Sequence, residues 1–388
     1  MRKKEQLVSR FKPFLMERMM SKYEQKVDYN LSESGVHPIY LRELYKEHPD
    51  ELAALLDSSL NYPHVNGLPE LRSRIANLYE GAREENVLVT VGGIEANFIA
   101  TRSLLEPGQE MVLMLPNYMQ IWGLAKDYNF NLKTFRLLEE NSWAPDLTEL
   151  EEQVTTDTKV IVVCNPNNPT GKILSEKEMA AVVAIADRVG AWILADEVYR
   201  GAERLEAEMS PSFYGQYDRV LATGSMSKAY GMPGLRIGWL LGPPKMLERA
   251  WEQHEYITLA ATMIANKIAS FALSPDVWPV ILERTRGYIR RGWSLLENWL
   301  EDQGNIIQVT APQAAAIAFL HYGLKINSSK LADKLRNEQS VLIVPGDHFG
   351  MDEFLRVSFG LPRDNLIAGL NRVSTLMKEL VETEGKSE

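Results

Sequence analysis

Short runs of apolar residues recur through the first two thirds of the chain, separated by segments in which apolar residues have helical spacing. Several of the runs are rich in β-branched residues, and seven runs are clear: Val87–Val91, Met111–Leu115, Leu132–Phe135, Val160–Cys164, Ala191–Ala195, Val220–Thr223 and Ile237–Leu241. Helical patterns such as Glu95–Leu105 and Glu176–Val189 lie between them. This alternation is typical of a parallel sheet covered on both faces. The sequence therefore predicts an α/β fold with a mostly parallel seven-stranded sheet.

The pattern changes at residue 276, where a long and highly charged helix is predicted over Asp276–Leu300. Beyond it, helices near Lys330–Asn337 and Leu366–Leu380 alternate with the predicted strands Ile306–Thr310, Ala315–Leu320, Val341–Val344 and Phe354–Phe359. We expect a large domain at residues 51–275, a smaller α+β domain at 276–388, and an N-terminal arm at 1–50 that joins the small domain. The arm has helical spacing over Phe11–Tyr23. A length of 388 residues also favours two domains.

Composition narrows the class of protein. An apolar content of 45% is that of a globular protein, and a net charge of -10 argues against nucleic acid or an anionic membrane as partner. Cys164 is the only cysteine, so no disulfide or cysteine-based metal site is expected and a reducing compartment fits. No uncharged run approaches the roughly 18 residues of a membrane span. We expect a soluble, cytoplasmic protein without a metal.

Polar motifs follow several of the predicted strands, at the edge where parallel sheets bind ligands. Gly92-Gly-Ile-Glu95 opens a helix, whose free N–H groups and dipole can hold an anion. The loop Asn165–Gly171 places the amide of Asn168 there, and Asp196-Glu-Val-Tyr199 adds a carboxylate and a phenol. Each motif taken alone also fits an ordinary turn, a helix cap or a satisfied core carboxylate.

A lysine and an arginine complete the set in Ser225-Met-Ser-Lys-Ala-Tyr-Gly-Met-Pro-Gly-Leu-Arg236, between two apolar runs. A lysine between buried strands is costly unless it is paired or used covalently, and a nearby cation lowers the pKa of an amine that forms a Schiff base. These groups match pyridoxal 5'-phosphate (PLP) group by group. They are an anion cradle, an arginine, an amide, a phenol, a carboxylate and a lysine. The phosphate, phenolic oxygen, ring nitrogen and aldehyde each find a partner.

The order of these motifs resembles that of the fold-type I, class I and II aminotransferases, over roughly residues 30–380. The motifs are Asn-Pro-x-Asn-Pro-Thr-Gly, Asp-Glu-Val-Tyr, Ser-x-Ser-Lys-x-x-Gly-x-x-Gly-x-Arg-x-Gly and Leu355-Arg-Val-Ser-Phe-Gly360. The resemblance implies a PLP-dependent transaminase that moves an amino group between an amino acid and a 2-oxo acid. It also implies an aspartate aminotransferase-like fold and a homodimer with shared active sites.

The resemblance assigns a role to each site residue. It makes Lys228 the Schiff-base lysine, Asp196 the partner of the ring nitrogen, and Tyr199 with Asn168 the partners of the phenolic oxygen. The remaining cofactor-binding residues are Gly93, Ile94, Ser225 and Arg236 at the phosphate, Tyr118 on the ring face, and Tyr62 from the neighbouring subunit. Arg356 is expected to bind the substrate carboxylate, with Gly35 at the edge of the site. For Arg356, a structural salt bridge is the alternative.

The N-terminal loop departs from the usual Ser-x-Gly-x-Pro pattern of the family and reads Leu31-Ser-Glu-Ser-Gly-Val-His-Pro38. It resembles the branch with capreomycidine synthase-like and arginine-hydroxylating enzymes, in which Glu33 would recognise a basic substrate. An exposed turn is the alternative. No second arginine for a dicarboxylic substrate can be placed. His254, Glu255 and Tyr256 are candidates for the border of the pocket, with an ordinary helix surface as the alternative.

The same constellation also serves lyases, oxidases and cyclases, because the cofactor carries the chemistry. A non-catalytic PLP-binding regulator is a further alternative, disfavoured because no basic domain precedes residue 30. The prediction is a transaminase.

Overall fold

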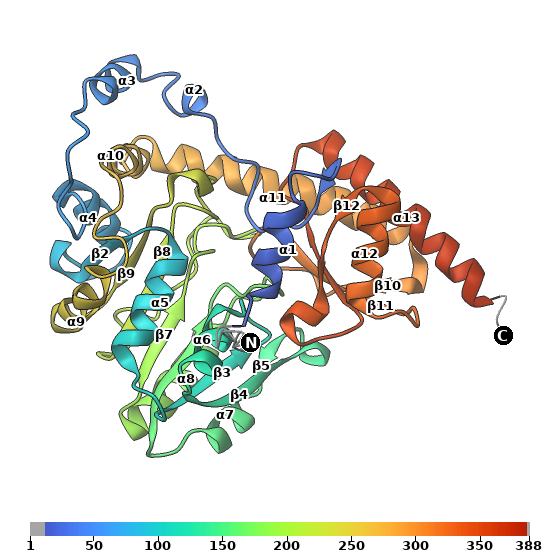
Figure 1. Ribbon diagram of the computed structural model, residues 1–388, viewed down its shortest axis with the longest axis horizontal. Helices are drawn as coiled ribbons and strands as arrows, with labels where there is room; N and C mark the ends of the chain where they lie inside the picture. The colour runs from blue at the N-terminus through green and yellow to red at the C-terminus, as the bar shows by residue number, and fades with distance from the viewer. Residues whose placement is uncertain (1–11, 386–388) are drawn as a thin grey trace, which may run out of the picture.

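The computed structural model of the protein describes residues 12–385, with two main sheets (Figure 1). The larger sheet has the strand order β2-β9-β8-β7-β6-β3-β4-β5. Its strands are β2 (Val87–Thr90), β3 (Glu110–Leu115), β4 (Asn131–Leu138), β5 (Ala144–Pro145), β6 (Thr158–Cys164), β7 (Trp192–Asp196), β8 (Val220–Ser225) and β9 (Gly238–Leu241). Strands β4, β3, β6, β7 and β8 are parallel neighbours, whereas β9 and β5 pair antiparallel.

The mostly parallel sheet is confirmed, and all seven predicted strands belong to it. The predicted count of seven was one too low, because the two-residue strand β5 extends the sheet beyond β4. Strand β6 shows why the pattern was informative. Val160 and Val162 pack into one apolar cluster, and Ile161 and Val163 pack into the other, so both faces of the strand are buried.

Helices cover both faces of this sheet (Figure 1). They are α4 (Pro69–Ala76), α5 (Gly93–Leu104), α6 (Gln120–Asp127), α7 (Leu147–Gln153), α8 (Glu176–Val189), α9 (Pro244–His254) and α10 (Met263–Ala272). The boundaries of α8 follow from local chemistry. Ser175 and Glu178 form a reciprocal capping box at its start, and Gly190 ends it in the left-handed conformation.

The smaller sheet has the antiparallel order β10-β11-β14-β13. Its elements are β10 (Ile307–Gln308), β11 (Ile317–Tyr322), β13 (Val344–Pro345), β14 (Phe354–Ser358), α11 (Trp278–Glu301), α12 (Ser328–Gln339) and α13 (Arg363–Gly385). The prediction of one strand over Val341–Val344 was wrong. The chain changes sheets at Ile343, so β12 (Val341–Leu342) pairs with β1 and β13 pairs with β14.

The N-terminal segment contacts both halves of the molecule. β1 (Tyr29–Asn30) pairs in parallel with β12, and α2 (Leu41–Leu44) and α3 (Pro49–Leu56) lead on towards α4 (Figure 1). The predicted first helix begins later than expected, as α1 (Leu15–Tyr23), and Phe11 lies outside the described residues. The domain boundaries at residues 50 and 275 stay predictions. Within residues 12–385, no helix is long and apolar enough to cross a membrane.

Candidate active site

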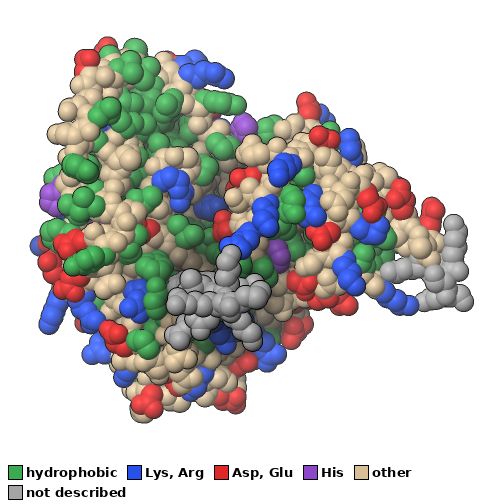
Figure 2. All heavy atoms as spheres, viewed as in Figure 1, with side chains coloured by type: hydrophobic (Ala, Val, Ile, Leu, Met, Phe, Trp, Pro, Cys, Tyr) green, Lys and Arg blue, Asp and Glu red, His purple; other side chains and the backbone are tan. Residues whose placement is uncertain are grey.

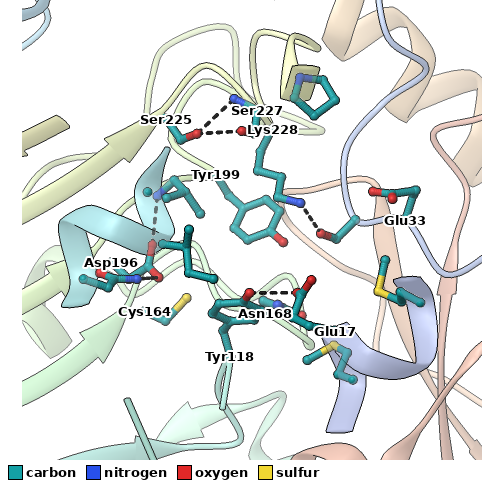
Figure 3. Close-up of a pocket in the computed structure, with 18 of the residues that line it drawn as sticks. Glu17, Glu33, Tyr118, Cys164, Asn168, Asp196, Tyr199, Ser225, Ser227 and Lys228 are labelled. Carbon is teal, nitrogen blue, oxygen red and sulfur yellow. Dashed lines mark hydrogen bonds between the residues drawn. The ribbon is translucent and has the colours of Figure 1, made fainter. Parts of the chain in front are cut away.

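A cavity of about 280 Å³ lies at the carboxyl ends of β6, β7 and β8, and α1 and the loop after β1 form its other wall. Figure 2 shows a recess at the centre of the molecular face that is turned towards the viewer. Eleven of the predicted site residues line the cavity: Glu33, Gly93, Ile94, Tyr118, Asn168, Asp196, Tyr199, Ser225, Lys228, Arg236 and Arg356. Segments far apart in the sequence therefore meet in one place, as Figure 3 shows.

The turn between β2 and α5 forms one end of the cavity. Gly92 has a φ of +81°, and a Cβ atom there would lie 2.4 Å from Nη2 of Arg236, so glycine is required for this close approach. Helix α5 begins at Gly93, and the N–H groups of its first turn, including that of Ile94, have no acceptor within the helix. The free donors, the positive end of the helix dipole and the guanidinium together can bind an anion.

Two serine hydroxyl groups lie beside this anion site. Ser225 ends β8, and a Cβ atom on Gly93 would lie 3.5 Å from its Cβ. The hydroxyl of Ser225 donates to that of Ser227 at 2.9 Å, and Nη1 of Arg236 is 3.5 Å from the same Ser227 oxygen. The arrangement suits a phosphate, which accepts hydrogen bonds on several oxygens.

Lys228 follows these serines and points into the middle of the cavity (Figure 3). Its Nζ donates to Oγ of Ser34 at 2.7 Å. Burial lowers the pKa of Lys228, and the positive charges of Arg356 and Arg236 lower it further, against the opposite influence of Glu33. A larger fraction of the amine is therefore neutral at a given pH, as a nucleophile or a general base requires.

Asp196 and Tyr199 come from the end of β7 and the turn after it, and both are buried. Burial raises the pKa of Asp196, while a hydrogen bond of 2.9 Å from the Asn97 amide opposes this rise. Burial also raises the pKa of Tyr199, although the charge of Arg356 lowers it in part. The phenol therefore stays protonated near neutral pH and can donate a hydrogen bond.

Arg356 lies in the middle of β14 with only 2% of its surface exposed. Its Nη1 donates to Oδ1 of Asn168 at 3.0 Å, and its Nη2 donates to the carbonyl oxygen of Ser32. Nε has no hydrogen-bond partner, and no ion pair with a carboxylate forms among the described residues. Because no carboxylate of the described residues pairs with Arg356, the predicted alternative of a structural salt bridge is wrong. A buried guanidinium with unused donors and no anion is costly.

Three carboxylates line the wall made by α1 and the loop after β1. Glu17 belongs to α1, Glu24 is the C-cap residue that directly follows this helix, and Glu33 follows β1. The Tyr118 hydroxyl donates to Glu17 at 2.7 Å (Figure 3). Burial raises the pKa of Glu24, and the negative charges of Glu33 and Glu17 raise it further. This wall is therefore strongly acidic, opposite in charge to the end with Arg236.

The remaining predicted residues do not line the cavity of this chain. Tyr62 is 84% exposed between α3 and α4, and Gly35 packs against Lys228, where a Cβ atom would lie 3.8 Å from Cδ of the lysine. The candidates His254, Glu255 and Tyr256 do not line this cavity either. His254 is buried beside Glu95, and the other two side chains are exposed.

Sequence reasoning missed several residues of the cavity, namely Glu17, Glu24, Ser34, Asn97 and Ser227. Ser227 stands inside the quoted lysine motif and could have been included. Asn97 and Glu17 occupy ordinary helical positions and Glu24 the C-cap of α1, with no local signal, because only the tertiary fold shows which face of α5 or α1 meets the cavity.

The residues fit PLP. The anion site suits its phosphate, Asp196 a protonated ring nitrogen, and Lys228 the aldehyde. Arg356 supplies Nη1 to Asn168, which leaves the NH₂ group of that amide, with the phenol of Tyr199, to donate to a phenolate oxygen. This donor set, rather than any single motif, defines the class of protein as a PLP-dependent enzyme of fold type I.

The sequence model of the family described as Aminotransferase class I and II matches residues 30–373, so the chain belongs to this family of PLP-dependent aminotransferases. It is similar to an aspartate aminotransferase of Pyrococcus horikoshii, 28% identical with 84% of this chain and 85% of that protein covered. It is also similar to capreomycidine synthase of Streptomyces vinaceus, 29% identical over 91% and 90% of the two chains. A PLP-dependent aminotransferase from Streptococcus suis has the same fold, with a TM-score of 0.90, 29% identity, and 95% and 98% of the chains covered.

Proposed function

We propose that this transaminase holds PLP on Lys228 and binds the carboxylate of its amino acid substrate on Arg356. This assignment is supported by the placement of a lysine with a lowered pKa between an anion site and a buried arginine that forms no ion pair among the described residues. PLP, when bound, withdraws electrons from the substrate carbon that loses its proton. Once the incoming substrate amine has displaced it from the cofactor, Lys228 would serve as the general base that takes and returns this proton, since its amine is within reach of the cavity centre.

Asp196 keeps the ring nitrogen protonated, which maintains the electron withdrawal. Arg236, Ser225 and the first turn of α5 would hold the phosphate, and Tyr118 would pack against the ring. Arg356 has five N–H bonds and uses two of them on Asn168 and Ser32. The remaining three suffice for the two parallel hydrogen bonds of an arginine–carboxylate fork.

A half-reaction tests transamination against elimination or oxidation. Enzyme loaded with PLP is mixed with an amino acid in the absence of any 2-oxo acid, and the cofactor is then extracted and identified. A transaminase converts the cofactor to pyridoxamine phosphate and releases one 2-oxo acid per site. Release of many product molecules per site, with the cofactor unchanged, would establish a lyase or an oxidase instead.

The acidic wall supports an amino donor with a cationic side chain. Glu17, Glu24 and Glu33 make no ion pair with a basic residue among the described residues, and no cluster there is suited to a metal ion. Arg356 would bind the α-carboxylate while a guanidinium or ammonium group of the substrate faces the glutamates. The similarity to capreomycidine synthase leaves a cyclase acting on such an amino acid as the second candidate function.

Comparing lysine with norleucine tests this substrate class, because the two differ mainly in the terminal charge. In Glu33→Gln, kcat/KM for lysine or arginine is expected to fall about tenfold, while that for norleucine stays unchanged. Glu338→Gln, which alters an exposed carboxylate paired with Lys334, is the control. Equal losses for both substrates would exclude a charge-reading role.

We also infer a homodimer with shared active sites. Several large apolar side chains are exposed on the side of α2, α3 and the loop after α9: Tyr40, Leu41, Leu56, Leu60, Tyr62, Tyr256, Ile257 and Leu259. Figure 2 shows hydrophobic side chains gathered at the upper left, over α3. A second copy of the chain would cover them. Light scattering should give twice the mass of 44.0 kDa. The cytoplasmic location stays a prediction from the single cysteine.

A further inference from the structure

Asn97 lies in the wall of the cavity, on the face of α5 that packs against the large sheet, and is 2% exposed. Its Nδ2 donates to Oδ2 of Asp196 at 2.9 Å, and its Oδ1 accepts from Oγ1 of Thr223 at 3.0 Å. The side chain therefore joins three elements, because Thr223 belongs to β8 and Asp196 ends β7.

The orientation of the Asn97 amide is fixed by its two neighbours. An ionised carboxylate only accepts hydrogen bonds, so the NH₂ group has to face Asp196. The carbonyl oxygen then faces Thr223, whose hydroxyl group can rotate to donate. A flipped amide would place two oxygen atoms in contact and leave buried groups unsatisfied, which is costly.

Asn97 is also the strongest polar contact of the Asp196 carboxylate. The N–H of Val198, at 3.3 Å from Oδ1, the charge of Lys228 and the hydroxyl group of Thr223 contribute less. Among the described residues, no lysine, arginine or histidine forms an ion pair with Asp196. Burial disfavours the anion and raises the pKa of Asp196, and the NH₂ group of Asn97 is the largest of the contacts that oppose this rise.

One helix carries both this donor and the anion site. Gly93 and Ile94 form the first turn of α5, and Asn97 follows one turn later. A separation of four residues corresponds to roughly 6 Å along a helix axis. The distance between the phosphate site and the Asp196 carboxylate is thus set by a rigid element.

We propose that Asn97, held by Thr223, is a positioning residue that orients the Asp196 carboxylate and keeps it ionised, so that the ring nitrogen of the cofactor retains its proton. The proposal rests on the function proposed above, in which Asp196 is the partner of that nitrogen. Without the Asn97 donor, the carboxylate becomes more basic and competes for the shared proton.

The protonation state of the ring nitrogen can be measured directly. Wild-type protein and variants are loaded with PLP labelled with ¹⁵N in the ring, and the ¹⁵N chemical shift is measured by NMR. Asn97→Leu keeps a similar shape without the donor, and its ¹⁵N signal should move from the protonated towards the unprotonated value. Thr223→Val removes the hydroxyl that holds the amide and should move the signal in the same direction by less.

Thr101→Val is the matched control, because Thr101 is buried on the same helix and its hydroxyl group donates to the backbone carbonyl oxygen of Asn97, not to its side-chain amide or to Asp196. It should leave the signal unchanged. The rate of substrate proton removal should fall about 10- to 100-fold in Asn97→Leu, as expected for loss of one hydrogen bond to a charged group.

A ¹⁵N signal in Asn97→Leu identical to that of the wild type would overturn the proposal. If Asn97→Leu fails to fold, the Thr223→Val variant tests the proposal instead. An unchanged ¹⁵N signal in Thr223→Val would also overturn it. Failure of the wild-type protein to bind PLP would instead refute the proposed function, and this inference with it.

Discussion

Replacement of Arg356 by lysine separates substrate recognition from structural support. Lysine keeps the positive charge but loses the planar fork, so it can make one hydrogen bond to a carboxylate where arginine makes two. Loss of one charge-assisted hydrogen bond costs about 1.5–3 kcal/mol, which corresponds to a 10- to 150-fold rise in apparent KM for every amino acid. PLP affinity should change little, because Arg356 contacts Asn168 and Ser32 rather than the anion site.

The assay compares each amino acid with the amine that lacks its carboxylate, in single-turnover half-reactions. Arg356→Lys should raise the apparent KM of the amino acid and leave the slow reaction of the corresponding amine unchanged. Arg286→Lys is the matched control, since Arg286 is buried and paired with Glu203 at 2.7 Å outside the cavity. It should lower the unfolding temperature without raising KM. The reasoning fails if Arg356→Lys loses stability or PLP affinity while KM for amino acids stays at the wild-type value.

Three further predictions concern the same site. Asp196→Asn preserves shape but cannot keep the ring nitrogen protonated, so stopped-flow measurement should show proton removal slowed by a factor of about 100 or more, and a change within threefold would indicate a structural carboxylate. Because burial lowers the pKa of Lys228 in the folded state, the unfolded chain binds more protons between that pKa and 10.5. The unfolding free energy of the cofactor-free protein should therefore rise with pH across this window relative to Lys228→Met, and parallel pH profiles would contradict the lowered pKa. A mixed dimer of Lys228→Ala and Tyr62→Phe subunits should retain one intact site and half of the wild-type activity, whereas activity equal to the average of the two single-variant homodimers would show that Tyr62 serves its own subunit.

Most strands of the large sheet could be predicted from local sequence. Buried parallel strands such as β6 are continuous apolar runs, and each was recognisable without tertiary information. Short strands were not recognisable. Ala144–Pro145 has no periodicity, and the division at Ile343 depends on two partner strands from opposite ends of the chain.

The site divides in the same way. Lys228 and Asp196 stand in motifs whose spacing reflects the turn after a strand, so sequence indicated them. The partners of these residues, Ser34 and Asn97, come from segments 194 and 99 positions away. Nothing in a helix of mixed polarity distinguishes Asn97 from a surface residue until the helix is packed against the sheet.

The central claim is that Lys228 holds the cofactor, and chemical fixation tests it most directly. Protein loaded with PLP is reduced with borohydride, digested and mapped by mass spectrometry, with Lys228→Ala alongside. Lys172→Ala is the control, because Lys172 is largely buried but paired with Glu178 outside the cavity. We expect label on Lys228 in the wild type and in Lys172→Ala, and none in Lys228→Ala. Label on any other lysine of the wild-type protein would contradict the claim.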